Sequence, residues 1–175
     1  MRLKNKTAII TGGGSGIGLA TARAFCKEGA KVILFGRRKE KLVSAANELG
    51  DSVLIVQGDM THNDDLDQLI NKSLNNFKGI DILVNSAGLF NGAPLHEISD
   101  SQWDGIMDIN IRSVFQLTRR VLPTMIAQKN GSIVHISSIA GLIALPGVAA
   151  YNVSKGALNQ FSRSIAVEYG SYGIR

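Results

Sequence analysis

Short apolar runs alternate along this chain with longer stretches in which apolar residues recur at helical spacing. The short runs are typical of buried strands, and they cover residues 7–10, 31–35, 53–56 and 80–84. The intervening stretches are typical of helices, and they cover about residues 17–27, 40–49 and 64–77. This alternation predicts a parallel sheet with right-handed crossovers and helices on both faces. Ligands of such sheets bind at the carboxyl ends of the strands.

The second half of the chain continues the pattern. Ser99 is placed to cap a long helix that runs to about residue 128, with Pro123 as the expected kink or restart. The apolar run at residues 132–137 predicts a fifth buried strand. A last helix is expected from about residue 150 to 169.

Composition narrows the class of protein. With 45% hydrophobic residues and no internal repeat or linker, we expect a single α/β domain over residues 1–175. The net charge is 19 − 14 = +5, but the basic residues are scattered, so nucleic-acid binding is the least favoured interpretation. Cys26 is the only cysteine and has no disulfide partner. Because we find no signal region and no apolar stretch of membrane-spanning length, we expect a cytoplasmic protein without membrane contact.

A glycine-rich loop at residues 11–18 lies between the first predicted strand and the first helix. Gly12, Gly16 and Gly18 give the spacing G-x-x-x-G-x-G. Glycines at such a place let the backbone approach a pyrophosphate, and the helix N-terminus favours its charge, so we expect dinucleotide binding. The alternative is a turn that binds nothing. Ser15 is either a phosphate donor or a helix cap.

Gly36, Arg37 and Arg38 follow the second predicted strand. NAD-binding proteins with such a loop usually carry an acid about twenty residues beyond it, and this chain has none before Glu40. A guanidinium pairs with a 2′-phosphate that an acid would repel, so we expect NADP(H) in preference to NAD(H). The alternative for both arginines is a solvated surface.

Tyr151 and Lys155 are four residues apart and so share one face of the last predicted helix. There the ammonium can favour the phenolate and lower a phenol pKa of about 10. Such a phenol is suited to exchange protons with an alcohol or a carbonyl. Ser138 follows the fifth predicted strand and precedes Tyr151 by thirteen residues, so strand end and helix start can meet over one substrate.

Four elements occur in the order known from one family. They are the glycine-rich loop, Asn85-Ser86-Ala87-Gly88, Asn110, and Ser138 with Tyr151 and Lys155. In this ordered set the chain resembles the short-chain dehydrogenase/reductase family from about residue 4 to 175. The resemblance implies a Rossmann-like doubly wound parallel sheet, truncated after the helix that carries Tyr151 and Lys155. Family members continue into further strands, so the strand at 132–137 is expected to border solvent or a partner.

The resemblance also implies roles for particular residues. Tyr151 would be the general acid/base, with Ser138 hydrogen-bonding the substrate oxygen. Lys155 would lower the Tyr151 pKa and hold the nicotinamide ribose, and Asn110 would support a proton relay, unless it only bends its helix. Asp59 would contact the adenine amino group or, alternatively, cap a helix. The implied catalytic set is Asn110, Ser138, Tyr151 and Lys155; the implied cofactor set is Gly12, Gly14, Ser15, Gly16, Ile17, Gly18, Arg37, Arg38, Asp59, Met60, Asn85, Ala87, Gly88, Tyr151 and Lys155.

The implied activity is reversible reduction of a ketone or oxidation of a secondary alcohol, with hydride moving between nicotinamide C4 and the carbonyl carbon. The apolar loop between Ile139 and Ala150 indicates a substrate with an apolar part, unless the loop packs into the core. Family members commonly form dimers or tetramers, so the resemblance implies a homodimer or homotetramer. The main alternative is a truncated dinucleotide-binding module without turnover. His62, His96 and His135 share no metal-ligand spacing, so no metal is expected.

Overall fold

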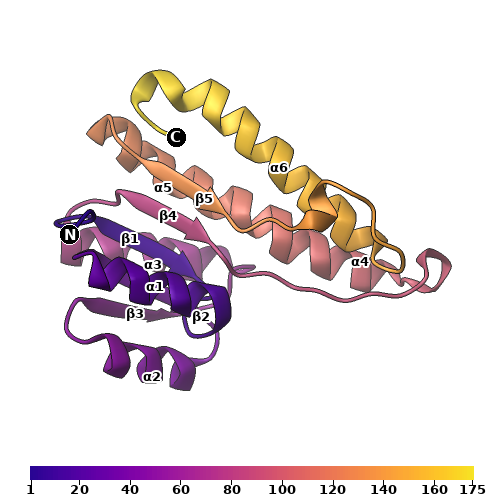
Figure 1. Ribbon diagram of the computed structural model, residues 1–175, viewed down its shortest axis with the longest axis horizontal. Helices are drawn as coiled ribbons and strands as arrows, with labels where there is room; N and C mark the ends of the chain where they lie inside the picture. The colour runs from indigo at the N-terminus through magenta and orange to yellow at the C-terminus, as the bar shows by residue number, and fades with distance from the viewer.

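The computed structural model describes residues 1–175 and has a five-stranded parallel sheet at its centre (Figure 1). The strands are β1 (Thr7–Thr11), β2 (Lys31–Gly36), β3 (Val53–Gln57), β4 (Ile82–Asn85) and β5 (Ser132–His135). The main helices are α1 (Gly16–Lys27), α2 (Lys39–Leu49), α3 (Asn63–Phe77), α4 (Asp100–Met107), α5 (Ser113–Gln128) and α6 (Ala149–Tyr169). The strand order is β3-β2-β1-β4-β5, so the order reverses beside β1. This is the predicted Rossmann-like α/β fold, and a ligand crevice is expected at the point of reversal.

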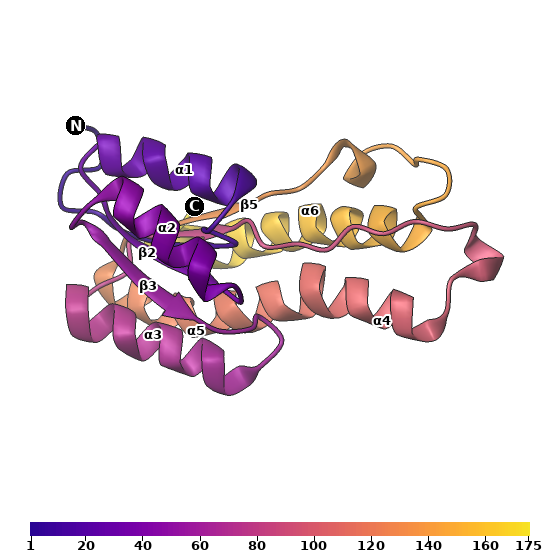
Figure 2. The ribbon, with the colours of Figure 1, turned by 90° about the horizontal axis from the view of Figure 1, so that it is seen from below.

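Helices cover both faces of the sheet (Figure 2), and an apolar cluster fills the space on each side. On one face, α1 and α2 pack through Ala22, Leu42 and Ala45 against alternate residues of the central strands. On the other face, α3 and α5 supply the larger cluster, with Leu66 and Leu117 among its fully buried side chains. Because β1 and β2 are covered on both faces, they read as continuous apolar runs in the sequence.

The long helix expected from Ser99 is interrupted, but not at Pro123. Ser99 caps α4 as predicted, and its hydroxyl accepts from the Gln102 amide at 3.2 Å. The break is a π-helical turn at Asp108–Arg112, and Pro123 lies within an unbroken α5. π turns occur frequently at functional sites. The helix therefore does not restart at Pro123, and Asn110 lies within the π turn.

The outer edge of β5 is partly covered by the end of the chain. The Ile133 amide donates to the Arg175 carbonyl at 2.8 Å, and the Arg175 amide donates to the Gly131 carbonyl at 3.1 Å. The start of β5 is therefore paired by residues 173–175, whereas Val134 remains 41% exposed. No helix of the structure combines the length and the apolar character that crossing a membrane requires.

Candidate active site and cofactor cleft

A cleft of about 360 Å³ opens at the carboxyl ends of β1 to β4. Eleven of the predicted cofactor residues line it, namely Gly12, Gly14, Ser15, Gly16, Ile17, Arg37, Arg38, Asp59, Met60, Ala87 and Gly88. The other four, which are Gly18, Asn85, Tyr151 and Lys155, lie outside its lining. The cleft thus gathers residues from four separate loops at one edge of the sheet, where parallel α/β folds bind their ligands.

The glycine-rich loop has the backbone geometry of a phosphate cradle. Gly12 and Gly16 adopt left-handed backbone angles, with φ of +66° and +53°. A Cβ on Gly12 would lie 3.1 Å from the Ala87 backbone, whereas nothing lies within 4 Å of a Cβ position on Gly16. Because Gly16 also begins α1, open backbone amides meet the positive end of a helix there. These features fit the pyrophosphate of a dinucleotide.

Gly18 has a packing function rather than a place in the cleft. It is buried, and a Cβ there would lie only 2.5 Å from the Gly12 carbonyl oxygen. Glycine at this position therefore lets α1 approach the loop that precedes it. Close helix-to-strand packing is one of the known uses of a glycine in such fingerprints.

The two arginines after β2 point to different partners. Arg38 Nη2 donates to Ser15 Oγ at 3.3 Å, which bridges the second loop to the glycine-rich loop. Ser15 stands at the N-cap of α1, but its hydroxyl makes no capping hydrogen bond. Arg37 is 70% exposed and lies 3.8 Å from an Asp59 carboxylate oxygen. Both guanidinium groups therefore belong to the same part of the cleft lining.

Asp59 does not cap a helix, since His62 holds the N-cap position of α3. Its carboxylate accepts hydrogen bonds from the Thr61 amide at 2.9 Å and from the Thr61 hydroxyl at 2.8 Å. Partial burial acts to raise the Asp59 pKa, but these hydrogen bonds, with the charges of Arg37 and His62, hold it below its ordinary value. The carboxylate therefore stays charged at the cleft.

The end of β4 is tied to the glycine-rich loop by Thr11. The Thr11 hydroxyl accepts from the amides of Ser86 and Ala87, each at 3.0 Å. This fixes the turn that leads into Gly88, which lines the cleft. A Cβ on Gly88 would lie 3.4 Å from Asn110 Oδ1 and 3.9 Å from Lys155 Nζ. Because Gly88 has no side chain, this part of the cleft lies directly beside Asn110 and Lys155, two of the predicted catalytic residues.

Asn110 is fully buried at the π turn and clamps the segment that follows β4. Its amide oxygen accepts from the Leu89 backbone amide at 2.8 Å, and its amide nitrogen donates to the Leu89 carbonyl at 2.9 Å. The same nitrogen donates to Ser154 Oγ at 3.0 Å, and Ser154 in turn donates to the Tyr151 carbonyl at 2.9 Å. The interrupted helix thus links the cleft wall to the helical turn that carries Tyr151.

Tyr151 and Lys155 share a face of α6 as the sequence predicts. Lys155 is only 6% exposed, and its Nζ donates to the Ile136 carbonyl at 2.7 Å. That nitrogen lies 5.6 Å from the centre of the Tyr151 ring. Burial lowers the pKa of Lys155, because the charged form loses hydration. The structure thus brings the Lys155 ammonium and the Tyr151 ring together on one face of α6.

Ser138 lies at the end of the segment after β5, close to α6. Its hydroxyl oxygen accepts from the Ala140 amide at 3.1 Å, which leaves the hydroxyl hydrogen free to donate. Ser137 Oγ donates to the Lys155 carbonyl at 3.4 Å, and Asn159 donates to the Gly141 carbonyl at 3.0 Å. These hydrogen bonds hold residues 137–141 against α6, the helix that carries Tyr151 and Lys155.

The apolar loop after Ser138 does not pack into the core. Ile139, Leu142 and Ile143 are 61%, 74% and 54% exposed. The core-packing interpretation of this loop is therefore excluded for these side chains. They form part of the exposed apolar surface near the mouth of the site.

Buried Asn85 and partly buried His135 form a pair at the carboxyl ends of β4 and β5. Asn85 Nδ2 and His135 Nδ1 are 3.1 Å apart, whereas Asn85 Oδ1 and His135 Nε2 have no partner. Burial and, second, the charge of Lys155 lower the His135 pKa to about 4. His135 is therefore neutral at physiological pH. No group of three metal-ligating side chains gathers in the structure.

Several residues at the site were missed by sequence reasoning. They are Lys41, Leu42, Leu89 and Ile109 in the cleft lining, and Thr11, Ser154 and Phe90 around it. Leu89 and Phe90 follow directly on the Asn85–Gly88 motif, so their adjacency was a usable signal. The positions of Lys41 and Ile109 depend on how helices pack across the cleft, which no local pattern encodes.

Comparison with known proteins agrees with this geometry. The family model described as short chain dehydrogenase matches residues 6–175. An uncharacterized oxidoreductase of Staphylococcus aureus strain USA300 is 37% identical over 174 residues, which is 99% of this chain and 75% of that protein. Nodulation protein G of Rhizobium sp. strain N33 is 37% identical over 172 residues, which is 98% of this chain and 70% of that protein. The chain belongs to the short-chain dehydrogenase/reductase family of oxidoreductases, whose members generally use NAD(P)(H).

Proposed function

We propose that this protein is an NADP(H)-preferring oxidoreductase that interconverts a ketone and a secondary alcohol. The observation that carries the proposal is the position of buried Lys155. It lies behind Gly88 of the dinucleotide cleft and 5.6 Å from the Tyr151 ring. A proton-transferring phenol therefore stands beside the place where a nicotinamide would lie.

The side chains at the site have separate roles in proton transfer and substrate orientation. When bound, the nicotinamide dinucleotide supplies or accepts the hydride. Tyr151 holds the proton that is given to, or taken from, the substrate oxygen. The free hydroxyl hydrogen of Ser138 hydrogen-bonds that oxygen and orients the carbonyl. Lys155 would hold the nicotinamide ribose, and Asn110 holds the backbone of Leu89 in place at the boundary between cleft and substrate.

The preference for NADP(H) is supported by the charges after β2. Arg37 and Arg38 both line the cleft, and Arg37 is largely exposed. The Arg37 guanidinium pairs only weakly with Asp59, at 3.8 Å. It can give up this contact and bind a 2′-phosphate in a bidentate way. NAD(H) lacks that phosphate and would gain less.

We also propose a cytoplasmic homodimer or homotetramer that acts on a small-molecule ketone or alcohol with an apolar part. Exposed apolar side chains of α5 and α6 support self-association, including Phe115, Val153 and Val167. Exposed apolar side chains of residues 139–143 support a substrate with an apolar part.

A dinucleotide-binding module without turnover is the alternative, and one pair of measurements separates them. Binding of NADPH and NADH would be followed by fluorescence titration on the 175-residue chain. Steady-state consumption of each cofactor would be followed with a panel of ketones, and NADP⁺ reduction with a panel of secondary alcohols. We expect turnover with preference for the phosphorylated cofactor. Tight binding without turnover on any panel member would favour the binding module.

A further inference from the structure

Two fixed segments frame the mouth of the site beyond Tyr151. One follows β4 and the other follows β5, and both run out past the sheet toward α4 (Figure 2). Asn110 clamps the first at Leu89, and Asn152 clamps the second, since its side chain donates to the Leu145 carbonyl at 2.8 Å. The segments touch at their far ends, where a Cβ on Gly92 would lie 2.6 Å from the Gly147 carbonyl oxygen. These contacts fix both segments in place, and we call the two segments the walls of the site.

These two segments carry large apolar side chains that remain mostly exposed. Phe90 is 65% exposed in the first segment, and Leu142 is 74% exposed in the second. Leaving such side chains in water is unfavourable, and when they gather beside polar catalytic groups they commonly mark a ligand site. The ligand that fits is one with a reactive polar group and an apolar body.

Phe90 is the one of these side chains that touches the proposed acid/base. Its ring meets the Tyr151 ring edge to face, with centroids 4.9 Å apart and an interplanar angle of 86°. This is a favourable geometry for an aromatic pair, and it leaves most of the Phe90 ring open. A carbonyl whose oxygen reaches the Tyr151 hydroxyl therefore places one of its substituents next to Phe90.

We propose that Phe90 is a specificity-determining residue that selects ketones and secondary alcohols bearing an aromatic ring on the reacting carbon. The proposal rests on the function proposed above, and it names the substrate class. A planar ring can stack against the exposed part of Phe90 while its carbonyl faces Tyr151 and Ser138. A short alkyl substituent cannot make that contact.

The test compares two methyl ketones that differ in one substituent, acetophenone and 2-butanone. The variants are Phe90→Ala and the conservative Phe90→Tyr, with Leu95→Ala as control because Leu95 is 68% exposed in the same segment. We expect Phe90→Ala to raise the KM for acetophenone roughly fivefold relative to that for 2-butanone, the scale of one aromatic contact. Phe90→Tyr should restore the preference, and Leu95→Ala should leave it unchanged. NADPH affinity should not change in any variant.

The outcomes separate this proposal from the proposed function. If the wild-type chain reduces both ketones and Phe90→Ala alters them equally or not at all, the role of Phe90 is overturned. If the wild-type chain reduces neither, the proposed function fails, and acetophenone binding to the NADP⁺-loaded chain is then measured by saturation-transfer NMR. Ring contacts that disappear in Phe90→Ala would support the Phe90 site on its own. Absent or Phe90-independent binding would overturn it.

Discussion

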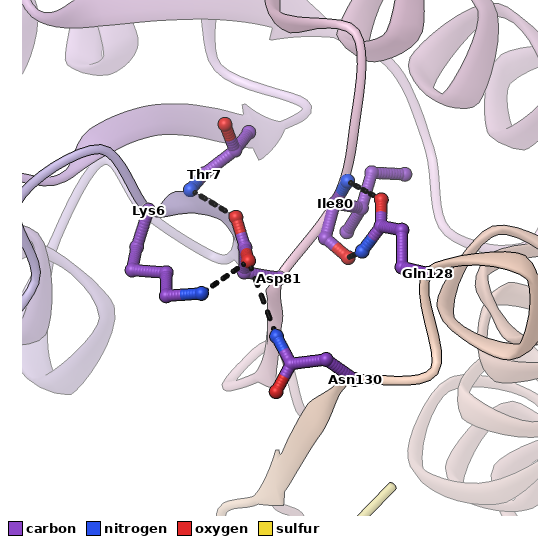
Figure 3. Close-up of polar contacts among 6 residues, drawn as sticks. All are labelled: Lys6, Thr7, Ile80, Asp81, Gln128 and Asn130. Carbon is purple, nitrogen blue, oxygen red and sulfur yellow. Dashed lines mark hydrogen bonds and ion pairs between the residues drawn. The ribbon is translucent and has the colours of Figure 1, made fainter. Parts of the chain in front are cut away.

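The two ends of the sheet are built by the same strands but use polar side chains in opposite ways. At the amino end, Asp81 accepts from Lys6 Nζ at 2.8 Å and from the Thr7 amide at 2.9 Å, with Asn130 nearby (Figure 3). The Gln128 side chain pairs with both backbone groups of Ile80, at 3.1 and 3.0 Å. Each of these groups has its partner within the chain, so this end ties β1, β4 and β5 together.

At the carboxyl end, many polar groups are left open. No atom lies within 4 Å of a Cβ position on Gly16, and Arg37 is mostly exposed. Where side chains are paired, as Asn110 is with Leu89, the pair holds backbone that borders the cleft. We therefore expect residues at the amino end of the sheet to contribute to stability and residues at the carboxyl end to contribute to ligand binding. Changes at the amino end should alter the free energy of unfolding, and changes at the carboxyl end should alter turnover and affinity.

The largest effect is expected for Tyr151→Phe, which removes the phenol oxygen and keeps the ring contact with Phe90. Loss of a general acid/base should lower kcat by roughly 10² to 10⁴. NADPH affinity should stay nearly unchanged, because the ring still fills its place. Lys155→Ala is the companion variant and should damage both quantities. Steady-state kinetics measures kcat, and fluorescence titration measures NADPH affinity. Near-normal turnover of Tyr151→Phe would show that Tyr151 is not the general acid/base.

The next effect concerns the amino end. Asp81→Ala leaves the Thr7 amide and Lys6 without their partner in a half-buried site, which should cost about 3 kcal/mol of unfolding free energy. Urea denaturation measures the loss, and the NADPH dissociation constant of the folded variant should match that of the wild type. Glu48→Gln is the control, because its pair with Arg23 is exposed and should contribute little. Equal losses in both variants would contradict a special role for Asp81.

A smaller effect is expected at the arginines. Arg37→Gln should weaken NADPH binding by about 2 kcal/mol, the scale of one charge-assisted contact, and affect NADH much less. Glutamine is preferred to aspartate here, since an added carboxylate would face Asp59. Arg38→Gln provides the comparison, because that side chain bridges to Ser15. Equal changes for the two cofactors in Arg37→Gln would count against recognition of a 2′-phosphate by Arg37.

The smallest effect tests whether one group at the carboxyl end also affects stability. The pKa of His135 is lowered to about 4 in the folded chain, so between that value and about 6.5 the unfolded chain binds the extra proton. The free energy of unfolding should therefore fall as pH is lowered, by on the order of 1.5 kcal/mol between pH 7 and 5. Urea denaturation at several pH values measures this slope. His135→Asn should flatten it, and an unchanged slope in that variant would show that other groups cause it.

Much of the fold and of the candidate site could be predicted because the signals are local. The apolar runs that became β1 and β2 are continuous because both faces of those strands are buried. The glycines of the loop were identifiable from their spacing between a predicted strand and a predicted helix, and glycine adopts the φ of +66° at residue 12 at little cost. Tyr151 and Lys155 share a helical face through their spacing alone.

Other features could not be predicted because they depend on contacts between distant segments. The sequence predicted a kink or restart at Pro123, but the α-helix is interrupted at the π turn, where Asn110 bonds the Leu89 backbone 21 residues earlier. The expected strand at 80–84 begins only at Ile82, because the Gln128 side chain holds both backbone groups of Ile80. In each case a side chain from another element competes for backbone hydrogen bonds.

The sequence by itself thus determined the alternation of strands and helices, the phosphate cradle and the pairing of phenol and ammonium, since each follows from spacing within one element. Only the tertiary structure decided that Gly18 packs against Gly12 while Gly16 stays open, that Arg37 and Arg38 face different partners, and that Phe90 lies on Tyr151. The physical reason is that burial, ion pairing and ring contacts are set by which surfaces meet when the sheet and its helices assemble, and those surfaces come from residues far apart along the chain.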